Sequence, residues 1–496
     1  MTHPTKTTDT SISLQDDAIP AKIPTGRALW VMMAMMLASN LLASFSQSLM
    51  NIALDQVATD FRVSLSIANW MVLGFTIVAA TVITTAASLL KRYGIRKVMT
   101  FGYIACFCGS LLGFLSWDFA SMVAARLIQA LTVGLFFPVI TSVILTISPQ
   151  GKRATMLAIN SGVIGIGLAF APLVAGLILT YAGLHALFLV PLALSLLLLV
   201  LGFFALHDIY ARQDKRVDLP SVLLSFFGLG IFILGLNEIT RYFAPSTICM
   251  LVGLAVILAF AYRQVHLEDP LLDLSPLKHP KFVTGEILMM LGYMGSIYMS
   301  LLVPLYLEGT VGETAFVAGS MLTLPILCYA LACFVGGHIE DKHGIWPLVP
   351  VGFLILLLGF IGMEITSSLM FVIAMIVCVA VSFIGVGLVF PTLKATDLGT
   401  LPREIYAHGS SIHSVLVQIA GSLGSALFVG IMSADADRAM AQGLSKADAY
   451  AQGFSHTLTI DIAIIAVAFI VSIFFARKVR KKAALDTKSK AAQQQE

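Results

Sequence analysis

The chain has 496 residues, of which 58% are hydrophobic and only 11% are charged, and its formal net charge is +3. Soluble domains carry about 25% charged residues, and the mean hydropathy here is +0.93. The composition therefore excludes an ordinary soluble enzyme and indicates lipid as the main solvent, while the small net charge gives no reason to expect a nucleic-acid partner.

Fourteen apolar runs are long enough to cross a bilayer, whose hydrocarbon core of ~30 Å requires about 20 apolar residues in a helix. The first 26 residues are polar and contain no short apolar core of a cleavable signal, so we expect the first run to be retained. The expected spans are residues 28–50, 68–90, 98–116, 120–147, 156–180, 184–206, 219–237, 246–262, 284–307, 315–338, 346–364, 369–392, 408–432 and 454–476.

Basic residues are distributed unevenly between the two sides of such a bundle. With both termini assigned inside, 25 of the 30 Lys and Arg residues lie in inside segments, two of them in the loop between 392 and 408. Four lie outside, and Arg126 alone lies within a span. Because basic residues accumulate in cytoplasmic loops, we expect a multi-pass protein of the cell membrane with both termini cytoplasmic.

The sequence lacks the motifs of several other functions. Cys106-x-Cys108 has no His or acid nearby, which argues against a metal site. No Gly-Lys-Ser/Thr loop could cradle a phosphate, and no soluble segment is long enough for a catalytic domain. We therefore expect no metal, no cofactor, no catalytic residues and no enzymatic activity.

Three short segments of the first half recur in the second at offsets of 250 or 253, although chance similarity among Gly- and Pro-rich helices is an alternative. The pairs are 134–139 with 387–392, 159–161 with 412–414, and Gly94 with Gly344. They match spans 2, 4 and 5 to spans 10, 12 and 13, so the halves are parallel and two spans are extra. Parallel six-helix halves are the organisation of the major facilitator superfamily.

We accordingly expect an all-α polytopic protein in five parts. They are a cytoplasmic tail (1–27), a six-helix half (28–206), a linker with two inserted helices (207–264), a second six-helix half (265–476) and a basic cytoplasmic tail (477–496).

Five longer stretches are more specific than these short repeats. They are "QSLMNIAL" with Asn51, Arg126-Leu-Ile-Gln129-Ala130, the Gly-rich "GVIGIGLAFAPLVAG" (162–176), "PLLDLSPLKHPKF" (270–282) and "LPREIYAHGSSIHSVLVQIAGSLGSA" (401–426). With these stretches, the second of them similar to an R-x-x-Q-G motif, the chain resembles the fourteen-helix drug:proton antiporters of this superfamily over roughly residues 28–476.

The chain also departs from the family pattern. The family often carries an acid five residues before the asparagine, and Ser46 stands there. The acid of the cytoplasmic turn after the second span is replaced by Lys91, whereas the second copy of the turn keeps Asp341 and Gly344. Proton coupling is therefore less firmly supported by the sequence than the fold.

Four ionisable residues are candidates for transport or proton coupling. Arg126 is an intramembrane charge of the kind that usually faces a cavity or a partner, with snorkelling towards the interface as the alternative. Glu286 could carry a proton or be a solvated acid at a helix start. His413 could titrate or be a hydrogen-bonded interface residue. Asp461 is the fourth candidate, on a span that resembles an outer scaffold helix.

The resemblance implies that spans 1, 4, 9 and 12 line a central cavity, and ordinary packing is the alternative for each side chain on them. Met adapts its shape to different ligands, and Tyr combines an apolar face with a polar tip. The substrate-cavity candidates are Asn40, Gln47, Gln129, Met290, Tyr293 and Tyr298.

The two similar turns and the fifth span are candidates for conformational control. Pro172 should bend its helix, and the resemblance implies that the turns latch the two halves together. The first turn offers only basic charges, so we expect Glu340 and Asp341 to supply the acids, unless the basic turn is only a topology signal. The gating candidates are Lys91, Arg92, Gly94, Pro172, Asp341 and Gly344.

These features predict a secondary transporter that exports amphipathic organic compounds, by proton antiport and alternating access. Its partners would be a small-molecule substrate, protons and the lipid bilayer, with the chain acting as a monomer. A dedicated exporter of one metabolite, organic anion or lipid is the alternative in the same class. A non-transporting membrane sensor or scaffold is the alternative from another class.

Overall fold

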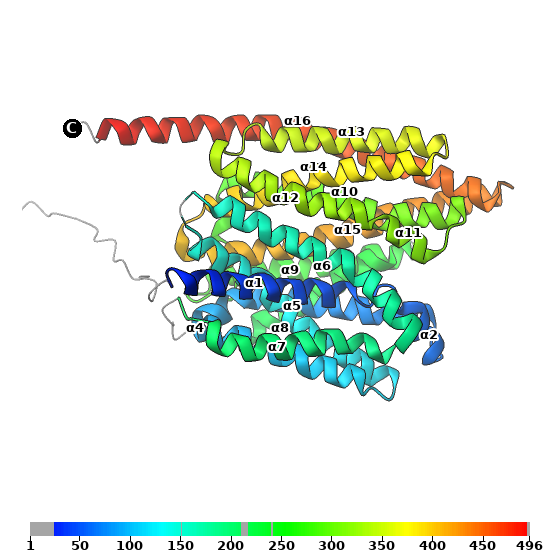
Figure 1. Ribbon diagram of the computed structural model, residues 1–496, viewed down its shortest axis with the longest axis horizontal. Coiled ribbons are helices and arrows are strands. Elements are labelled where there is room, and N and C mark those ends of the chain that lie inside the picture. Colours follow the sequence, from blue (N-terminus) through cyan, green and yellow to red (C-terminus); the bar gives the residue numbers. More distant parts are fainter. Residues whose placement is uncertain (1–23, 150, 210–216, 240–241, 494–496) are drawn as a thin grey trace, which may run out of the picture.

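The computed structural model describes residues 24–149, 151–209, 217–239 and 242–493, and these ranges are helical with no strand (Figure 1). Most of the tail expected at 1–27, part of the linker expected at 207–264, and the last three residues lie outside the described residues. Thirteen described helices are long and apolar enough to cross a membrane.

The first half contains five long helices and three short ones. They are α1 (Arg27–Ser48), α2 (Leu54–Asp60), α3 (Leu65–Ala68), α4 (Trp70–Phe114), α5 (Phe119–Ile147), α6 (Arg153–Ala182), η1 (His185–Phe188) and α7 (Leu189–Ala205). Helix α4 holds two of the expected spans, because Gly94 interrupts its 45 residues with φ 79° and ψ 169°. A residue with a side chain adopts such a positive φ only with strain. With this division the thirteen candidate helices account for fourteen spans.

Helices α8 (Leu219–Glu238) and α9 (Phe243–His266) are the two inserted helices. Leu229 and Ile233 of α8 pack against Leu73 and Ile77 of α4, and Ile419 of α15 lies against the same cluster. The inserted pair therefore contacts both halves.

The second half contains six spans and several short elements. They are η2 (Ser275–Lys278), α10 (Pro280–Tyr306), η3 (Leu307–Val311), α11 (Ala315–Met321), α12 (Thr323–His343), α13 (Leu348–Ser368), α14 (Val372–Gly399), η4 (Arg403–Ile405), α15 (Tyr406–Ala441) and α16 (Lys446–Gln493). The span expected at 315–338 is divided at Leu322 into α11 and α12. Helix α14 continues beyond the expected end at 392, so Lys394 lies within a helix and not in a loop.

The helices run along one common direction, with the first half in the lower part of Figure 1 and the second half in the upper part. Helix α1 begins and α16 ends at the same end of the bundle, on the left in Figure 1, which we call the terminal face. The opposite end is the far face. Helices α4 and α5 meet at the far face, because α4 crosses the bundle twice.

The two halves share buried apolar packing near the terminal face. One cluster joins Ile144 and Leu157 of the first half to Phe282, Leu398 and Tyr406 of the second. Nearer the far face, the cluster around Leu49 and Met122 contains only residues of the first half. The described conformation is thus closed by side-chain packing at the terminal face.

Candidate functional site

Arg126 is fully buried on the third turn of α5, counted from the far face. Its Nη1 donates to the carbonyl oxygen of Ser46 at 2.9 Å and to Gln129 Oε1 at 2.8 Å. Gln129 in turn donates to Ser110 Oγ at 2.8 Å. The guanidinium carbon lies 4.2 Å from the centre of the Phe75 ring, a cation–π contact. The two polar residues singled out in this motif therefore contact one another.

The other edge of the same guanidinium is unpartnered. Arg126 Nε and Nη2 are buried and have no hydrogen-bond partner among the described residues, and the same holds for Ser46 Oγ. No ion pair between Arg126 and an acid occurs in the described part of the chain.

A group of ionisable side chains is buried in the second half, towards the terminal face. His413 Nδ1 of α15 lies 3.1 Å and 3.2 Å from the two carboxylate oxygens of Glu286 on α10. Both side chains are at most 3% exposed. The structure thus pairs two candidates that the sequence proposed separately.

Two further members of this group come from α14. Lys394 is 4% and Asp397 is 1% exposed, and each interacts electrostatically with Glu286. Both Asp397 oxygens lack a hydrogen-bond partner among the described residues. A Cβ atom on Gly285 would lie 1.9 Å from Asp397 Oδ1. The absence of a side chain at 285 therefore makes room for this carboxylate beside Glu286.

Aromatic residues lie next to this group. The Phe390 ring centre is 5.9 Å from that of His413 and 5.7 Å from that of Tyr293. Met290 and Tyr293 are half-buried. An apolar, partly accessible surface therefore adjoins the ionisable group.

The remaining cavity candidates lie in different surroundings. Tyr298 is fully buried, its hydroxyl donates to the Phe454 carbonyl at 3.0 Å, and aromatic rings surround it. Asn40 donates to Asn160 Oδ1 at 2.6 Å, which links α1 to α6. Gln47 is half-buried near the end of α1. In this conformation Tyr298 and Asn40 thus belong to packed helix contacts.

Asp461 on α16 faces inward although its helix lies at the outside of the bundle. It is fully buried, and both oxygens lack a hydrogen-bond partner among the described residues. A Cβ atom on Gly295 of α10 would lie 3.7 Å from Asp461 Oδ2. Helix α10 therefore has a carboxylate against a glycine at two levels, Asp397 at Gly285 and Asp461 at Gly295.

Asp341 connects the halves at the terminal face. Its carboxylate accepts hydrogen bonds from the backbone amides of Ala154 and Thr155 at 3.0 Å and 2.9 Å. These amides belong to the first turn of α6, whose own N-cap residue, Lys152, makes no capping hydrogen bond through its side chain. Carboxylates are favoured at such helix N-termini. One half therefore caps a helix of the other.

The basic turn after the second span contacts its own half. The backbone amide of Arg96 donates to Asp208 Oδ1 at 2.9 Å, and a Cβ on Gly94 would lie 2.6 Å from the same oxygen. Arg92 lies over the Tyr93 ring, and Lys91 is half-buried. Asp208, just after α7, is thus an acidic partner of this turn that motif comparison did not reveal.

The remaining gating candidates are Gly344, at the end of a helix, and Pro172, inside one. Gly344 ends α12 with φ 75°, and Pro172 lies inside α6.

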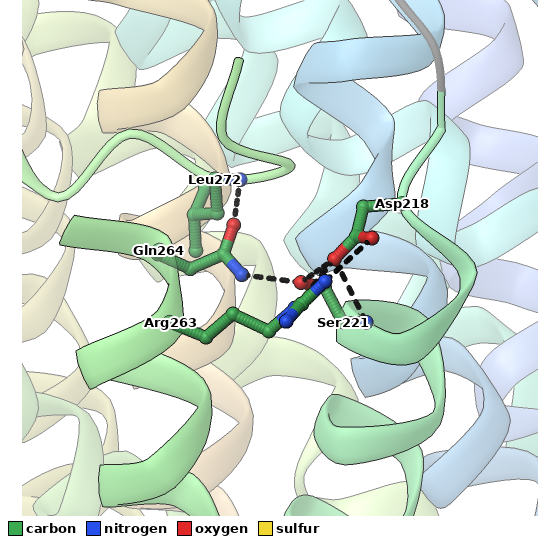
Figure 2. Close-up of polar contacts among 5 residues, drawn as sticks. All are labelled: Asp218, Ser221, Arg263, Gln264 and Leu272. Carbon is green, nitrogen blue, oxygen red and sulfur yellow. Dashed lines mark hydrogen bonds and ion pairs between the residues drawn. The ribbon is translucent and has the colours of Figure 1, made fainter. Parts of the chain in front are cut away.

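The inserted helices are tied together at the terminal face by a polar network (Figure 2). Arg263 of α9 holds the Asp218 carboxylate with Nε and Nη2 at 2.8 Å and 2.9 Å. Arg263 lowers the pKa of Asp218 to about 2. Gln264 donates to Ser221 Oγ and accepts from the Leu272 amide. The next residue, Asp273, donates its amide to His408 of α15 at 3.1 Å. The network therefore links α8, α9, the following loop and the second half.

The Major Facilitator Superfamily model matches residues 36–425. The chain belongs to this superfamily. Among its relatives, the lincomycin resistance protein LmrB of Bacillus subtilis is 28% identical over 468 residues, which cover 91% of this chain and 96% of that protein. The riboflavin transporter RibZ of Clostridioides difficile is 23% identical, covering 91% and 98%.

Solved structures show the same superfamily fold. The human organic anion transporter MFSD10 matches with a TM-score of 0.65 and 12% identity over 90% of this chain and 99% of that chain. The proton:xylose symporter XylE matches with a TM-score of 0.60 and 14% identity over 88% and 94%. At these identities the likeness concerns the fold alone.

Within this superfamily fold, the described chain places a lone buried arginine in the first half and an acid-rich group in the second. Sequence reasoning missed Lys394 and Asp397. The available signal was their i, i+3 spacing, which puts both on one face of a helix if the span is extended beyond 392. It also left Asp341 without its partner, because a backbone amide carries no sequence signature.

Proposed function

We propose that this superfamily member is a secondary transporter of the cell membrane that exports amphipathic organic compounds in exchange for protons. The lincomycin resistance relative supports export of such compounds. The distribution of basic residues supports a cytoplasmic terminal face, with both termini inside. The conformation closed at that face is then the outward-facing one, and the functional unit is a monomer with the five-part organisation expected from the sequence.

The observation that carries proton coupling is the buried group of Glu286, His413, Lys394 and Asp397. Ionisable residues inside membrane spans are costly and usually mark ion pathways or proton relays. A carboxylate with unpartnered oxygens in such a place gains more from taking up a proton than an exposed one does. Asp397 fits this description in the described conformation.

Coupling to the conformational change follows from where the group lies. Glu340 on α12 interacts electrostatically with Asp397 and accepts a hydrogen bond from Thr396 at 3.0 Å. Its neighbour Asp341 caps α6 of the other half. Protonation within the group changes the charge beside the contact that closes the terminal face. Proton uptake from outside and release inside would thereby alternate with opening of that face.

The test is gradient-driven transport in inside-out vesicles, using a panel of amphipathic compounds. Wild type should transport at least one compound when a proton gradient is imposed. Glu286→Gln should remove most of the response to the gradient. Glu308→Gln is the matched control, because Glu308 follows α10 but is exposed at the far face. Equal loss in both variants, or none in either, would contradict the proposed coupling site.

The dedicated export of an organic anion is a second candidate function. The observation that favours it is the fully buried Arg126, which has no carboxylate partner among the described residues. The same panel tests it when anionic and cationic members of similar size are compared. Transport restricted to cationic members would exclude it.

A further inference from the structure

The strongest unexplained feature of the described chain is the free edge of Arg126. An arginine side chain stays protonated in proteins and offers five N–H donors in a planar fork. At Arg126, Nη1 donates both hydrogen bonds to the protein, whereas Nε and Nη2 make none with the described residues. These two atoms form one edge of the fork, the edge that matches the two oxygens of a carboxylate.

The same edge of another arginine in this chain holds a carboxylate. Arg263 uses the same two atoms, Nε and Nη2, to hold both oxygens of Asp218 at 2.8 Å and 2.9 Å (Figure 2). That pair is partly exposed, with 38% and 21% of the side chains accessible. Arg126 is fully buried, so an unsatisfied edge is more costly there than it would be at Arg263.

The described groups around Arg126 stabilise its charge but do not neutralise it. Phe75 covers a face of the guanidinium, and Gln129 and the Ser46 carbonyl accept from Nη1. Ser110 and Cys106 complete the polar surroundings. All of these groups are neutral, and the side chain at position 46 brings a second buried, unpartnered polar atom, Ser46 Oγ.

Arg126 lies nearer the far face than the terminal face, beside the apolar cluster of Leu49 and Met122. Arg126 is the eighth residue of α5, which begins at the far face, and Ser46 is the third residue from the end of α1. The largest apolar cluster shared by the two halves lies towards the terminal face, and a smaller one joins Leu73 and Ile77 of α4 to Ile419 of α15.

We propose that the Nε/Nη2 edge of Arg126 binds a monovalent anionic group, either the carboxylate of a transported organic compound or a small inorganic anion. The first source rests on the proposed export function, and the second does not. In both cases the anion supplies the counter-charge that Arg126 does not find among the described residues.

Anion binding is measured on the purified full chain by thermal unfolding, in a low-salt buffer titrated with sodium benzoate or sodium chloride. Wild type should be stabilised in a saturable way. Stabilisation by benzoate alone identifies a carboxylate site, and stabilisation by chloride alone identifies an inorganic anion site. Ser46→Asp supplies an internal counter-charge and should weaken the apparent anion affinity at least tenfold. Ser46→Asn, of the same size but neutral, should keep it.

Two arginine variants complete the design. Arg126→Met removes the fork and should abolish the anion effect, whereas Arg62→Gln removes an exposed arginine and should not. If Ser46→Asp fails to fold, the comparison of Arg126→Met with Arg62→Gln decides the question. An equal anion effect in Arg126→Met and wild type, or no saturable effect in wild type, overturns the proposal. Because this readout needs no transport, it stands apart from a failure of the export assay.

Discussion

The two halves share a backbone plan but differ in their buried charges. The first half buries Arg126, which has no acidic partner among the described residues. The second half buries two carboxylates, a lysine and a histidine within one group, with Asp461 at a separate level. The two halves therefore repeat short sequence motifs but bury different ionisable residues.

This difference suggests that the two halves have different functions in transport. A lone guanidinium with a free edge is suited to holding an anionic group, because it keeps its charge over the whole physiological pH range. A group that contains carboxylates and a histidine is suited to gaining and losing protons. Substitutions at the Arg126 site in the first half should therefore reduce ligand binding and transport. Substitutions in the ionisable group of the second half should reduce coupling to the proton gradient.

The largest effect is expected for Arg126→Ala. The substitution removes the only charge of the first-half site and leaves the Gln129 and Ser46 acceptors without a donor, so we expect loss of transport by about a hundredfold or more. Arg126→Lys should restore only part of it, because lysine lacks the planar fork. The measurement is efflux in vesicles, with membrane insertion checked in parallel. Normal efflux by a well-inserted Arg126→Ala variant would show that Arg126 is not needed for transport.

The second-largest effect is expected for Gly285→Ala, which tests the ionisable group of the second half. In Gly285→Ala the new methyl group would lie 1.9 Å from Asp397 Oδ1, so the carboxylate must move away from Glu286. We expect gradient-driven transport to fall about tenfold, because small displacements of a functional side chain reduce the rate of the step that it serves.

Gly292→Ala is the matched control on the same helix. Its new Cβ would meet Phe353 at an ordinary distance of 3.6 Å, so transport should stay near the wild-type rate. Equal rates for the two alanine variants would show that the position of Asp397 does not matter.

A smaller effect is expected at the contact between the halves. Asp341→Asn keeps one acceptor but loses the charge at the N-terminus of α6, which should weaken closure of the terminal face by about 1 kcal/mol, or roughly fivefold. Introduced cysteines near that face should become more accessible to a thiol reagent, and transport should slow.

Lys91→Ala should have less effect than Asp341→Asn, because the basic turn that holds Lys91 packs within the first half. Arg96 of this turn donates hydrogen bonds to Asp208 and to the Phe203 carbonyl of that half. Restoring an acid with Lys91→Asp should not rescue Asp341→Asn. Unchanged accessibility and transport in Asp341→Asn would refute a latch at this contact.

The smallest effect is expected for Asp218→Asn in the inserted helices. Arg263 lowers the pKa of Asp218 to about 2, so the ionised form is stabilised by folding. This contribution is fully present above the unfolded pKa of about 4 and is lost as the pH falls towards 2. We expect a loss of about 1 kcal/mol or less, since the pair is partly exposed.

Between pH 5 and 8 the effect of Asp218→Asn on thermal stability should therefore be constant, and the pH profile of transport should match wild type. A changed transport profile in this range would place the inserted helices within the coupling machinery.

Much of the fold could be predicted from the sequence, because a membrane span is a local run of apolar residues that needs no knowledge of tertiary contacts. The split of 315–338 at Leu322 and the extension of α14 to Gly399 could not, since both depend on packing. Arg126 with Gln129 was predictable as an i, i+3 pair on one helix. The pairing of Glu286 with His413 was not, because 127 residues separate them. The contact of Asp397 with Gly285 became visible only once two helices were placed side by side.

The most direct test of the division between the halves compares two assays on the same vesicles, gradient-driven efflux and gradient-free exchange of a transported compound. Glu286→Gln should lose most of its gradient-driven efflux while keeping exchange near the wild-type rate, because binding and the conformational change remain possible without coupling. Arg126→Gln should lose both. If Glu286→Gln retains gradient-driven efflux, or if Arg126→Gln loses only the response to the gradient, the assignment of coupling to the second half is contradicted.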